Sequence, residues 1–499
     1  MKLIETSMEK YIISLDQGTT STRAILFSLD GRIKAISSRP LPCYYPYSGA
    51  VEQDPLEIII SVNDTIRELM IKESLVPSQI LSIGITNQRE TTIVWEKSTG
   101  KPVYNALVWQ SKQSQEICEN LKDKEEFIRE KTGLILNPYF SASKIRYMLD
   151  HIENGQERAE NGELLFGTVD TWVLYRLTEG KSFYTDYSNA SRTLLFNIYT
   201  RNWDEELLSL FNIPACMLPK VIDSSSIFGY SSILSETTLI PIAGILGDQQ
   251  SSLFGQTCFT EGDIKNTYGT GCFLLMNIGK EPILYNKGLL TTLAWGINGE
   301  FTYAIEGSVL IGGASIQWLR DELKIIENSP ESEEIAYRTK NDDVYVVPAF
   351  VGLGTPYWDN NCRGAIFGLT RNSSRDVITK ATLESIAYQS KDVMEVMKKE
   401  TKKKFTTLSV DGGASSNHYL LQFQSDILNL KIRKSETSET TALGVYYLCC
   451  LTLGLYKSLD EIKKAHRISE VYKPNMDKTI RKEKYRKWKT AVSAARKFI

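Results

Sequence analysis

Two stretches of this chain change in the same way from an apolar run to a short polar turn. Near the start, mainly apolar residues 11–15 lead into Asp-Gln-Gly-Thr-Thr-Ser-Thr-Arg at 16–23, and a second apolar run follows at 24–27. Midway along, residues 264–267 lead into Tyr-Gly-Thr-Gly-Cys-Phe at 268–273, again followed by apolar residues. Short runs of this kind bounded by glycine predict a strand, a tight turn and a second strand. The repetition indicates two similar halves.

Further strands are predicted around the first turn. The Asp30-Gly31 pair between two apolar runs is a strong hairpin signal. Residues 80–86 form a continuous apolar run that ends in Asn-Gln-Arg-Glu at 87–90. This pattern predicts a buried strand with polar and charged side chains at its C-terminal end, and another strand is predicted at 91–95.

Helices are predicted where apolar residues recur every three or four positions. Residues 55–75 have a mixed helical pattern, and charged, helix-favouring sequence fills 114–132 and 144–160. Residues 442–456 are largely apolar but fall short of the ~20 residues that a membrane span needs, so we interpret them as a buried helix. Helical spacing is also found at Leu383, Ile386, Val393 and Met397 and, after Asn417, at Leu420, Phe423 and Ile427.

The length and composition indicate two closely packed domains. A chain of 499 residues is too long for a single core. No segment rich in Pro, Gly or Ser separates the halves, so we place the domains at 1–256 and 257–499 and expect them to pack against each other. Each is expected to be an α/β domain with a mixed sheet, with a cleft between the two.

Charge and cysteine content argue against several classes of protein. The formal net charge of −2 gives no electrostatic argument for nucleic acid as a partner, and we interpret the basic stretch at 478–497 as a solvated helix face. The eight cysteines form no CxxC motif, and none pairs with a histidine at zinc-site spacing. We therefore expect thiols in a reducing cytoplasm and no transmembrane segment.

The first turn has the chemistry of a phosphate-binding site. Bare backbone N–H groups and hydroxyls in a glycine-rich turn suit a phosphate chain. Asp16 closes the first strand and would repel phosphate unless a divalent cation lay between them; Mg²⁺ accepts one or two carboxylates together with phosphate oxygens. The alternative is an aspartate that only caps its own turn. The neighbouring Thr19, Thr20, Ser21 and Arg23 favour the metal.

Two further segments could recognise and activate a hydroxylated substrate. Arg89 and Glu90 combine guanidinium donors with a carboxylate acceptor, although a simple surface ion pair accounts for them equally well. Asp248 follows Gly247, whose missing side chain lets a ligand approach the backbone. Asp248 could be the general base that accepts a hydroxyl proton during attack on a γ-phosphate. It could also be a helix N-cap, and the two roles are compatible.

A glycine pair precedes a third candidate segment. Gly412 and Gly413 would let a flat ring lie against the backbone, and Asn417 can donate to and accept from an adenine or a ribose. The pair alone is weak evidence, since any tight turn accounts for it. The sequence contains no GxxxxGK[ST], HExxH, GxSxG or protein-kinase motif, and no GxGxxG after the first strand.

In this order, the four elements resemble those of the FGGY carbohydrate kinases, in the actin-like ATPase superfamily. The resemblance runs from about residue 10 to about residue 460. Its most specific segments are LDQGTTSTRA at 15–24, GITNQRETTIVWEKSTGKPVYNALVWQ at 84–110, GTVDTWVLYRLT at 167–178, TDYSNASRTLLFNI at 185–198, GDQQSSLFGQ at 247–256, NTYGTGCFLLMNIG at 266–279 and DGGASSN at 411–417.

The resemblance implies a role for each candidate residue. Asp16 would hold Mg²⁺, and Asp248 would be the catalytic base. The phosphates of ATP would be bound by Thr19, Thr20, Ser21 and Arg23 from the first half and by Thr270 and Gly271 from the second. The nucleoside would be framed by Gly313, Gln317, Gly413 and Asn417. The hydroxyls of glycerol would be bound by Arg89, Glu90, Tyr139, Asp248 and Gln249, with Trp109 and Phe273 against its carbon side.

The resemblance also implies two ribonuclease-H-like domains, each a mixed β-sheet flanked by helices, with the active site in the cleft between them. The first domain would bind polyol and phosphates, and the second the nucleotide. The implied reaction is ATP-dependent phosphorylation of glycerol to sn-glycerol 3-phosphate in glycerol catabolism, by a cytoplasmic homodimer or homotetramer.

Two alternatives to this function remain open. One is a kinase of the same family that acts on a pentulose or a longer polyol, and the other is an actin-like ATPase switch without a small substrate. The aromatic walls at Trp109 and Phe273 favour a small substrate, and an ATPase switch has no need of the Arg89-Glu90 pair.

Overall fold

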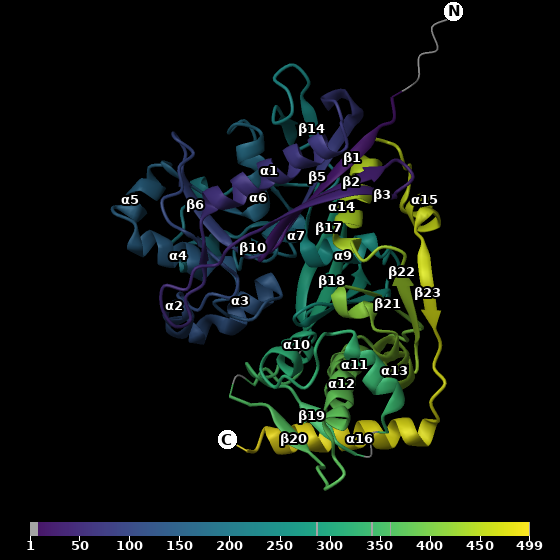
Figure 1. Cartoon of the computed structure of the whole chain (residues 1–499). Coiled ribbons are helices and arrows are strands. Elements are labelled where there is room, and N and C mark those ends of the chain that lie inside the picture. The colour runs from purple at the N-terminus through teal and green to yellow at the C-terminus, as the bar shows by residue number, and fades with distance from the viewer. Residues whose placement is uncertain (1–7, 286–287, 341–342, 360, 499) are drawn as a thin grey trace, which may run out of the picture.

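Each half of the protein is built on its own β-sheet. The computed structural model describes residues 8–285, 288–340, 343–359 and 361–498, and Figure 1 shows the two sheets one above the other. The first sheet has the order β13-β14-β5-β1-β2-β3 and the second β17-β18-β16-β15-β21-β22-β23. The strands of the first are Gly229–Ser231, Ile240–Gly247, Ile80–Asn87, Tyr11–Gln17, Ser21–Ser28 and Ile33–Pro40. Those of the second are Leu290–Ile297, Glu300–Val309, Cys272–Gly279, Ile264–Tyr268, Thr407–Asp411, Lys431–Ser435 and Ile468–Tyr472.

The two sheets repeat one arrangement of five strands. In the first, β1, β2 and β3 form an antiparallel meander, β5 lies parallel to β1, and β14 lies parallel to β5. In the second, β15, β16 and β18 are the three antiparallel strands at the matching positions, β21 lies parallel to β15, and β22 lies parallel to β21. The predicted pair of similar α/β halves is therefore confirmed, and each polar turn joins the first two strands of its half.

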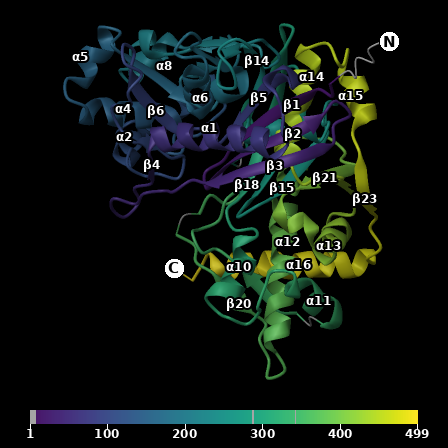
Figure 2. The same ribbon diagram turned by 45° about the horizontal axis from the view of Figure 1, so that its top comes forward.

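The first sheet is covered by helices from both halves of the chain. Ile13 and Leu15 pack on the face that carries α1 (Pro55–Lys72) and α6 (Val169–Leu177), and Figure 2 shows α1 running along this sheet. Ile12, on the opposite face, packs with α14 (Thr440–Thr452). This alternation is the period of two expected of a strand. Because α14 belongs to the second half, the expected close packing of the halves is confirmed.

Two glycines allow α14 to lie directly against α9 (Asp248–Gly255), the helix that follows the last strand of the first sheet. A Cβ atom on Gly255 would lie 2.0 Å from the carbonyl oxygen of Thr440, and one on Gly444 would lie 2.0 Å from that of Ser251. Neither position can therefore hold a larger residue without separating the helices. This contact fixes the start of α9, where Asp248 lies.

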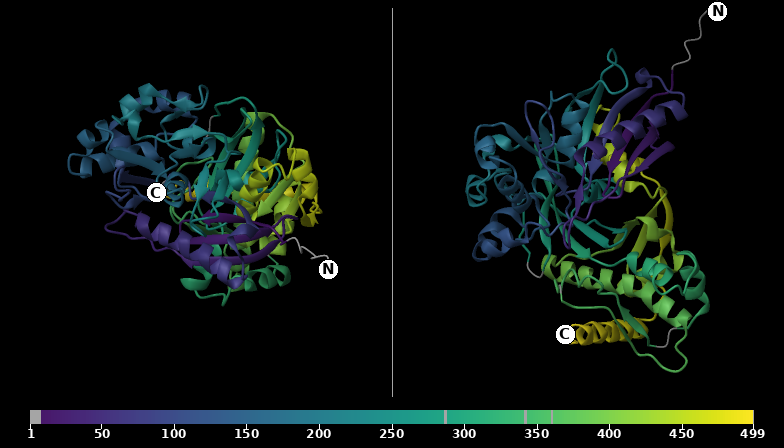
Figure 3. Two further views of the ribbon diagram at one scale, coloured as in Figure 1. Left: turned by 90° about the horizontal axis from the view of Figure 1, so that it is seen from above. Right: turned by 60° about the vertical axis from the view of Figure 1, so that its left-hand side comes forward.

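The helices of the second half cover the lower part of the molecule. They are α10 (Ala314–Asp321), α11 (Glu331–Arg338), α12 (Arg375–Thr401), α13 (His418–Leu428) and α16 (Lys478–Ala495), whereas α15 (Leu459–Ala465) lies at the upper right of Figure 1. Figure 3 shows α16 at the base, beneath α12. The apolar residues predicted on α12 and α13 are buried, as is most of α14. Within the described ranges, no helix is long and apolar enough to cross a membrane.

An insertion in the first half forms a smaller sheet with its own helices, at the left of Figure 1. Its strands have the order β4-β7-β6-β8 (Glu52–Gln53, Ala106–Leu107, Thr92–Glu96 and Leu164–Thr168). The helix-favouring segments at 114–132 and 144–160 form four short helices, α2 (Gln115–Asn120), α3 (Glu125–Thr132), α4 (Ser141–His151) and α5 (Gly155–Glu160). Gly133 in the left-handed conformation ends α3.

The remaining elements are short and connect these layers. They are 3₁₀ turns at Pro77–Gln79, Lys122–Lys124, Ala215–Met217 and Gly413–Ser416, helices α7 (Tyr187–Ala190) and α8 (Glu205–Leu210), and strands β9 (Tyr184–Asp186), β10 (Phe196–Asn197), β11 (Asn202–Trp203), β12 (Lys220–Ile222), β19 (Tyr345–Val347) and β20 (Ala365–Phe367).

Candidate active site

The predicted site residues lie where the parallel strands of the two sheets end. In the first sheet, Asp16 is near the end of β1, Arg89 follows β5, and Asp248 follows β14. In the second, Tyr268 ends β15 and Asp411 ends β21. Crevices at the carboxyl ends of parallel strands are the usual ligand sites of open α/β sheets. The topology therefore gives each half an edge suited to binding.

An arginine in the first turn links carboxylates from both halves. The Gly18 N–H donates to the Ser21 carbonyl at 2.9 Å and closes the turn. Arg23 is ion-paired with Asp16 across the β1–β2 pair, and its Nη1 lies 2.6 Å from Oε2 of Glu439, next to α14. Burial raises the pKa of Glu439, and the Arg23 guanidinium opposes that shift. Here Arg23, expected on the phosphates, is held by two carboxylates.

The donor set at Asp16 suits magnesium. Mg²⁺ prefers oxygen ligands and commonly takes one or two carboxylates, completing its shell with phosphate oxygens and water. Asp16 supplies such a carboxylate beside the hydroxyl-rich turn, and Glu439 lies across Arg23 from it. The described residues contain no group of three or more histidine, cysteine, aspartate or glutamate side chains that could hold a metal ion.

The turn of the second half is attached to the start of α10. The Gly312 N–H donates to the Thr270 carbonyl at 2.7 Å, and the Gly313 N–H to the Gly269 carbonyl at 2.9 Å. A Cβ atom on Gly271 would lie 2.4 Å from the Val309 carbonyl oxygen, so the backbone here is closely packed. Thr270 is exposed beside the turn, and Gln317 is exposed on α10. The structure brings these predicted nucleotide residues together.

The glycine pair after β21 leads into a capped helix. Gly412 has a positive φ of 87°, and Gly413 is exposed. The Asn417 side chain accepts a hydrogen bond from the Leu420 N–H at 2.9 Å and caps α13, while its Nδ2 donates to the Ser332 hydroxyl at 3.3 Å. Asn417 is therefore already engaged in positioning α13, in addition to any contact with a nucleoside.

Four buried charges form a closed ring at the predicted polyol site. Glu306 Oε2 lies 2.7 Å from Arg89 Nη1, and Glu306 Oε1 lies 3.2 Å from Arg192 Nη2. Arg192 Nε donates to Glu90 Oε1 at 2.6 Å, and Glu90 lies 3.8 Å from Arg89 Nε. All four side chains are at most 2% exposed. Arg89 and Glu90 are thus not a surface ion pair, and the second half holds Arg89 in place.

The ring shifts the pKa values of its two carboxyl groups in opposite directions. Burial raises the pKa of Glu306, but the guanidinium groups of Arg192 and Arg89 outweigh burial and lower it to about 2. For Glu90, burial outweighs the two arginines and raises the pKa. Glu306 is therefore a permanent carboxylate at neutral pH, and it anchors both arginines.

Asp248 contacts this ring and remains open to solvent. Its Oδ1 lies 3.2 Å from Arg89 Nε, and its side chain is 32% exposed. Burial raises the pKa of Asp248, against the attraction of Arg89. Gly247 occupies the N-cap position of α9 and Asp248 is its first residue, so the N-cap interpretation of Asp248 is wrong by one position. The carboxylate is left accessible, so a bound hydroxyl could come within hydrogen-bond reach of it, as a general base requires.

The aromatic residues are only partly arranged as expected. Trp109 packs edge-on against Tyr139 with ring centroids 5.4 Å apart, and its Nε1 donates to the Thr19 hydroxyl at 2.9 Å. The tryptophan therefore links the polyol side to the phosphate turn. Phe273 is half-buried and packs against the cluster shared by α14 and the sheets.

Sequence reasoning missed three charged residues of the site, namely Arg192, Glu306 and Lys265. Arg192 lies in a loop after α7, Glu306 in the middle of β18, and Lys265 in β15. Lys265 is fully buried, and its Nζ donates to Gln249 Oε1 at 2.6 Å. For Glu306 and Lys265 the available signal was a charged residue within an apolar strand, because such residues are rarely buried unless they are paired.

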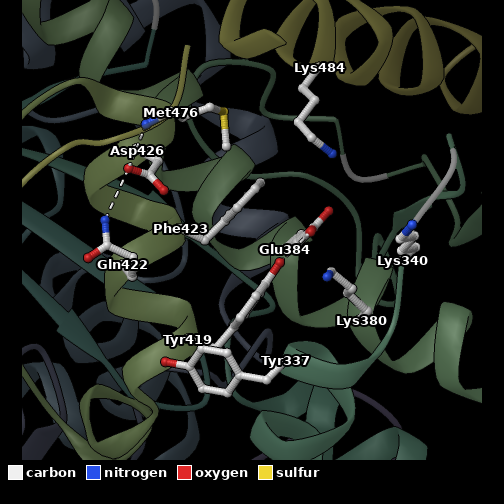
Figure 4. Close-up of a pocket in the computed structure, with 10 residues that line it drawn as sticks. All are labelled: Tyr337, Lys340, Lys380, Glu384, Tyr419, Gln422, Phe423, Asp426, Met476 and Lys484. Atoms are coloured by element: carbon white, nitrogen blue, oxygen red, sulfur yellow. Dashed lines mark hydrogen bonds between the residues drawn. The ribbon is translucent and has the colours of Figure 1, made fainter.

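A separate cavity of about 350 Å³ lies among α11, α12, α13 and α16 (Figure 4). Lys380 in its wall donates to the Ala336 and Thr339 carbonyls at 2.8 and 2.5 Å and lies 4.9 Å from the ring centre of Tyr419. None of the predicted site residues lines it. Lys380 and Tyr419 instead hold the end of α11 against α13.

The sequence and the fold are similar to those of known proteins. The models of the FGGY family of carbohydrate kinases match at residues 11–255 for the N-terminal domain and 264–453 for the C-terminal domain. A glycerol kinase of Bacillus licheniformis is 52% identical, with 98% of this chain and all of the relative covered. The crystal structure of Plasmodium falciparum glycerol kinase with ADP is 36% identical and superposes with a TM-score of 0.91 over 98% of each chain. A xylulose kinase structure from Lactobacillus acidophilus shares the fold. It is 23% identical and superposes with a TM-score of 0.87, covering 98% of this chain and 99% of that one.

Proposed function

This chain belongs to the FGGY family of carbohydrate kinases, and from that membership we propose that it transfers the γ-phosphoryl group of ATP to glycerol. The product is sn-glycerol 3-phosphate, and the reaction serves glycerol catabolism. Relatives named glycerol kinase are 51–52% identical over nearly the whole chain, which supports this substrate over a pentulose. The proposal covers the substrate, the residues that act on it and the metal.

The observation that carries the proposal is the contact of Asp248 with Arg89 beside the buried ring. An accessible carboxylate 3.2 Å from a fixed guanidinium offers an acceptor and a donor to neighbouring hydroxyls of a small polyol. Glu90, Tyr139 and Gln249 complete the polar side, and Trp109 and Phe273 form the carbon side. A site with polar groups on one side and aromatic groups on the other fits a short polyol.

The reaction follows from these positions. Asp248 accepts the proton of a terminal hydroxyl as its oxygen attacks the γ-phosphorus, the bond from that phosphorus to the bridging oxygen breaks, and ADP leaves. Thr19, Thr20, Ser21 and Arg23 bind the phosphates from the first half, and Thr270 and Gly271 bind them from the second. Asp16 holds Mg²⁺, which neutralises charge on the phosphates when bound. Closure of the halves excludes water.

The two halves divide the binding between them. We assign polyol and phosphate binding to residues 1–256 and nucleotide binding to residues 257–499. Gly313, Gln317, Gly413 and Asn417 frame the nucleoside, a role supported by the packing of the Gly312-Gly313 segment against the second turn.

Assembly and location complete the proposal. We place the enzyme in the cytoplasm, which agrees with eight unpaired cysteines, and we propose a homodimer or homotetramer. Leu56, Ile60 and Ile71 are 43%, 57% and 78% exposed at helical spacing along α1, which supports association through that face. Light scattering after gel filtration measures the mass, and a monomer would contradict the assembly.

A coupled assay of ADP release tests the function. Glycerol should stimulate turnover of Mg-ATP, and xylulose should give little. Turnover that prefers xylulose would keep the mechanism but change the substrate. ADP release that ignores every polyol would indicate an ATPase switch instead.

A further inference from the structure

A buried lysine lies beneath the polyol site in the middle of the second sheet. Lys265 is fully buried in β15, which pairs with β16 on one side and β21 on the other. Its Nζ donates to Gln249 Oε1 at 2.6 Å and to the Thr267 hydroxyl at 2.8 Å. Both partners are neutral, and no carboxylate of the described residues lies within ion-pair distance of Nζ. Burying a charge is costly unless it is paired or hydrogen-bonded, so these two hydrogen bonds are important to the state of Lys265.

The lysine belongs to a continuous chain of hydrogen bonds between the two ends of the site. From Lys265, the Thr267 hydroxyl continues to the Ser252 hydroxyl at 3.2 Å, and Ser252 donates to Asp411 Oδ2 at 2.8 Å. Asp411 ends β21 immediately before the glycine pair. The chain therefore runs from Gln249, on the polyol side, to the turn assigned to the nucleoside.

Asp411 is held firmly at the far end of the chain. Its Oδ2 also accepts from Gln256 Nε2 at 2.9 Å and from the Thr440 hydroxyl at 2.6 Å. With Ser252 this makes three donors to one oxygen from α9 and α14, the helices packed together through glycine. Lys265 is thus anchored to a rigid support, and its ammonium can fix the direction of the Gln249 amide.

Longer-range charges explain why an ammonium is tolerated at this position. The acidic groups that face Lys265 are Asp411, Asp248 and Glu306, and Arg89 is the opposing cation. Burial lowers the pKa of Lys265 to about 8, against the attraction of these carboxylates. The lysine remains protonated near neutral pH and places its charge between the base and the nucleotide turn.

We propose that Lys265 is a positioning residue that orients the Gln249 amide for the polyol and joins it to the Asp411 turn. The proposal rests on the assigned function and adds a residue to it. Lys265 engages the Oε1 atom of the Gln249 side chain. The Nε2 atom of the same amide is therefore the group left to donate to a hydroxyl. Without the ammonium, the amide can rotate and present either atom.

The test combines kinetics with a double-mutant cycle. Lys265→Met should raise KM for glycerol about 10- to 100-fold, the loss expected for a hydrogen bond from a charged donor, and should leave KM for ATP much less affected. Lys265→Gln keeps an N–H donor and should recover part of the loss. Because the lysine acts through Gln249, Lys265→Met should add little to Gln249→Ala in the double variant.

A second buried lysine provides the control. Lys391 on α12 is 8% exposed, lies 2.8 Å from Glu395 and stacks over Tyr485, away from the site. Lys391→Met should alter thermal stability without changing KM for glycerol. If both lysine variants shift stability and neither shifts KM, or if the effects of Lys265 and Gln249 are additive, the positioning role is wrong. A wild-type enzyme inactive on glycerol would instead refute the proposed function.

Discussion

Replacement of Glu306 by glutamine should weaken both the fold and the polyol site. Glu306→Gln keeps the size of the side chain and removes the charge that Arg89 and Arg192 share at 2.7 and 3.2 Å. In the folded protein the pKa of this carboxyl is lowered from 4.5 to about 2. A shift of that size corresponds to about 3 kcal/mol of stabilisation of the charged form, in line with the ~3–5 kcal/mol lost on breaking a buried ion pair.

The pH dependence gives this prediction its sign. A carboxyl whose pKa is lower in the folded than in the unfolded chain stabilises the fold above its unfolded pKa, and the contribution is lost as pH falls through the folded pKa. The wild-type advantage over Glu306→Gln should therefore be full at pH 7 and shrink below about pH 4.5 towards pH 2. Guanidinium unfolding of both proteins at a series of pH values measures it.

A second glutamate on the same strand is the matched control. Glu300 at the start of β18 pairs with Lys280, and both side chains are 71% exposed. Glu300→Gln should change the unfolding midpoint little, because exposed ion pairs contribute little. The reasoning is refuted if Glu306→Gln is no less stable than Glu300→Gln, or if the deficit grows as the pH is lowered. Loss of the Arg89 anchor should also raise KM for glycerol.

Three further predictions concern the base, the substrate arginine and the helix contact. Asp248→Asn should lower kcat by ~10²–10⁴, and near-normal turnover would contradict the role of Asp248 as the base. In the wild type, kcat/KM should fall at acid pH with an apparent pKa above 3.8, because burial raises the pKa of Asp248. This acid limb should be absent from the pH profile of the variant. Arg89→Lys should cost about 1.5–3 kcal/mol in glycerol binding, and an unchanged KM would contradict the contact. Gly444→Val should separate α9 from α14 and lower the melting temperature, since its Cβ would lie 2.0 Å from the Ser251 carbonyl oxygen; a wild-type melting temperature would show that the helices can move apart.

Local patterns in the sequence predicted the framework well. The two polar turns, the hairpin at Asp30-Gly31 and the buried helices were correct because each depends on neighbours in the chain, such as a glycine or a helical repeat of apolar residues. Helix-favouring sequence at 114–132 and 144–160 does form helices, but each segment is interrupted, the first by the 3₁₀ turn Lys122–Lys124 and the second near the left-handed Asn154. Helix-favouring composition alone does not locate such breaks.

The chemistry of the site was only partly predictable, because its charges are paired across the fold. Glu306 binds Arg89, which is 217 residues away in sequence, and Lys265 binds Gln249, which is 16 residues away. No local spacing indicates these contacts. Arg23 illustrates the same limit. Its place in the turn suggested phosphate, and no local pattern indicated that it also pairs with Glu439, 416 residues away.

The most direct test of the account is the rate of ADP release from Mg-ATP by wild-type and Asp248→Asn protein, with and without glycerol. We predict turnover that depends on glycerol in the wild type and falls by ~10²–10⁴ in the variant. Equal ADP release with and without glycerol, or equal rates for the two proteins, would contradict the assignment of this cleft as a glycerol-phosphorylating site.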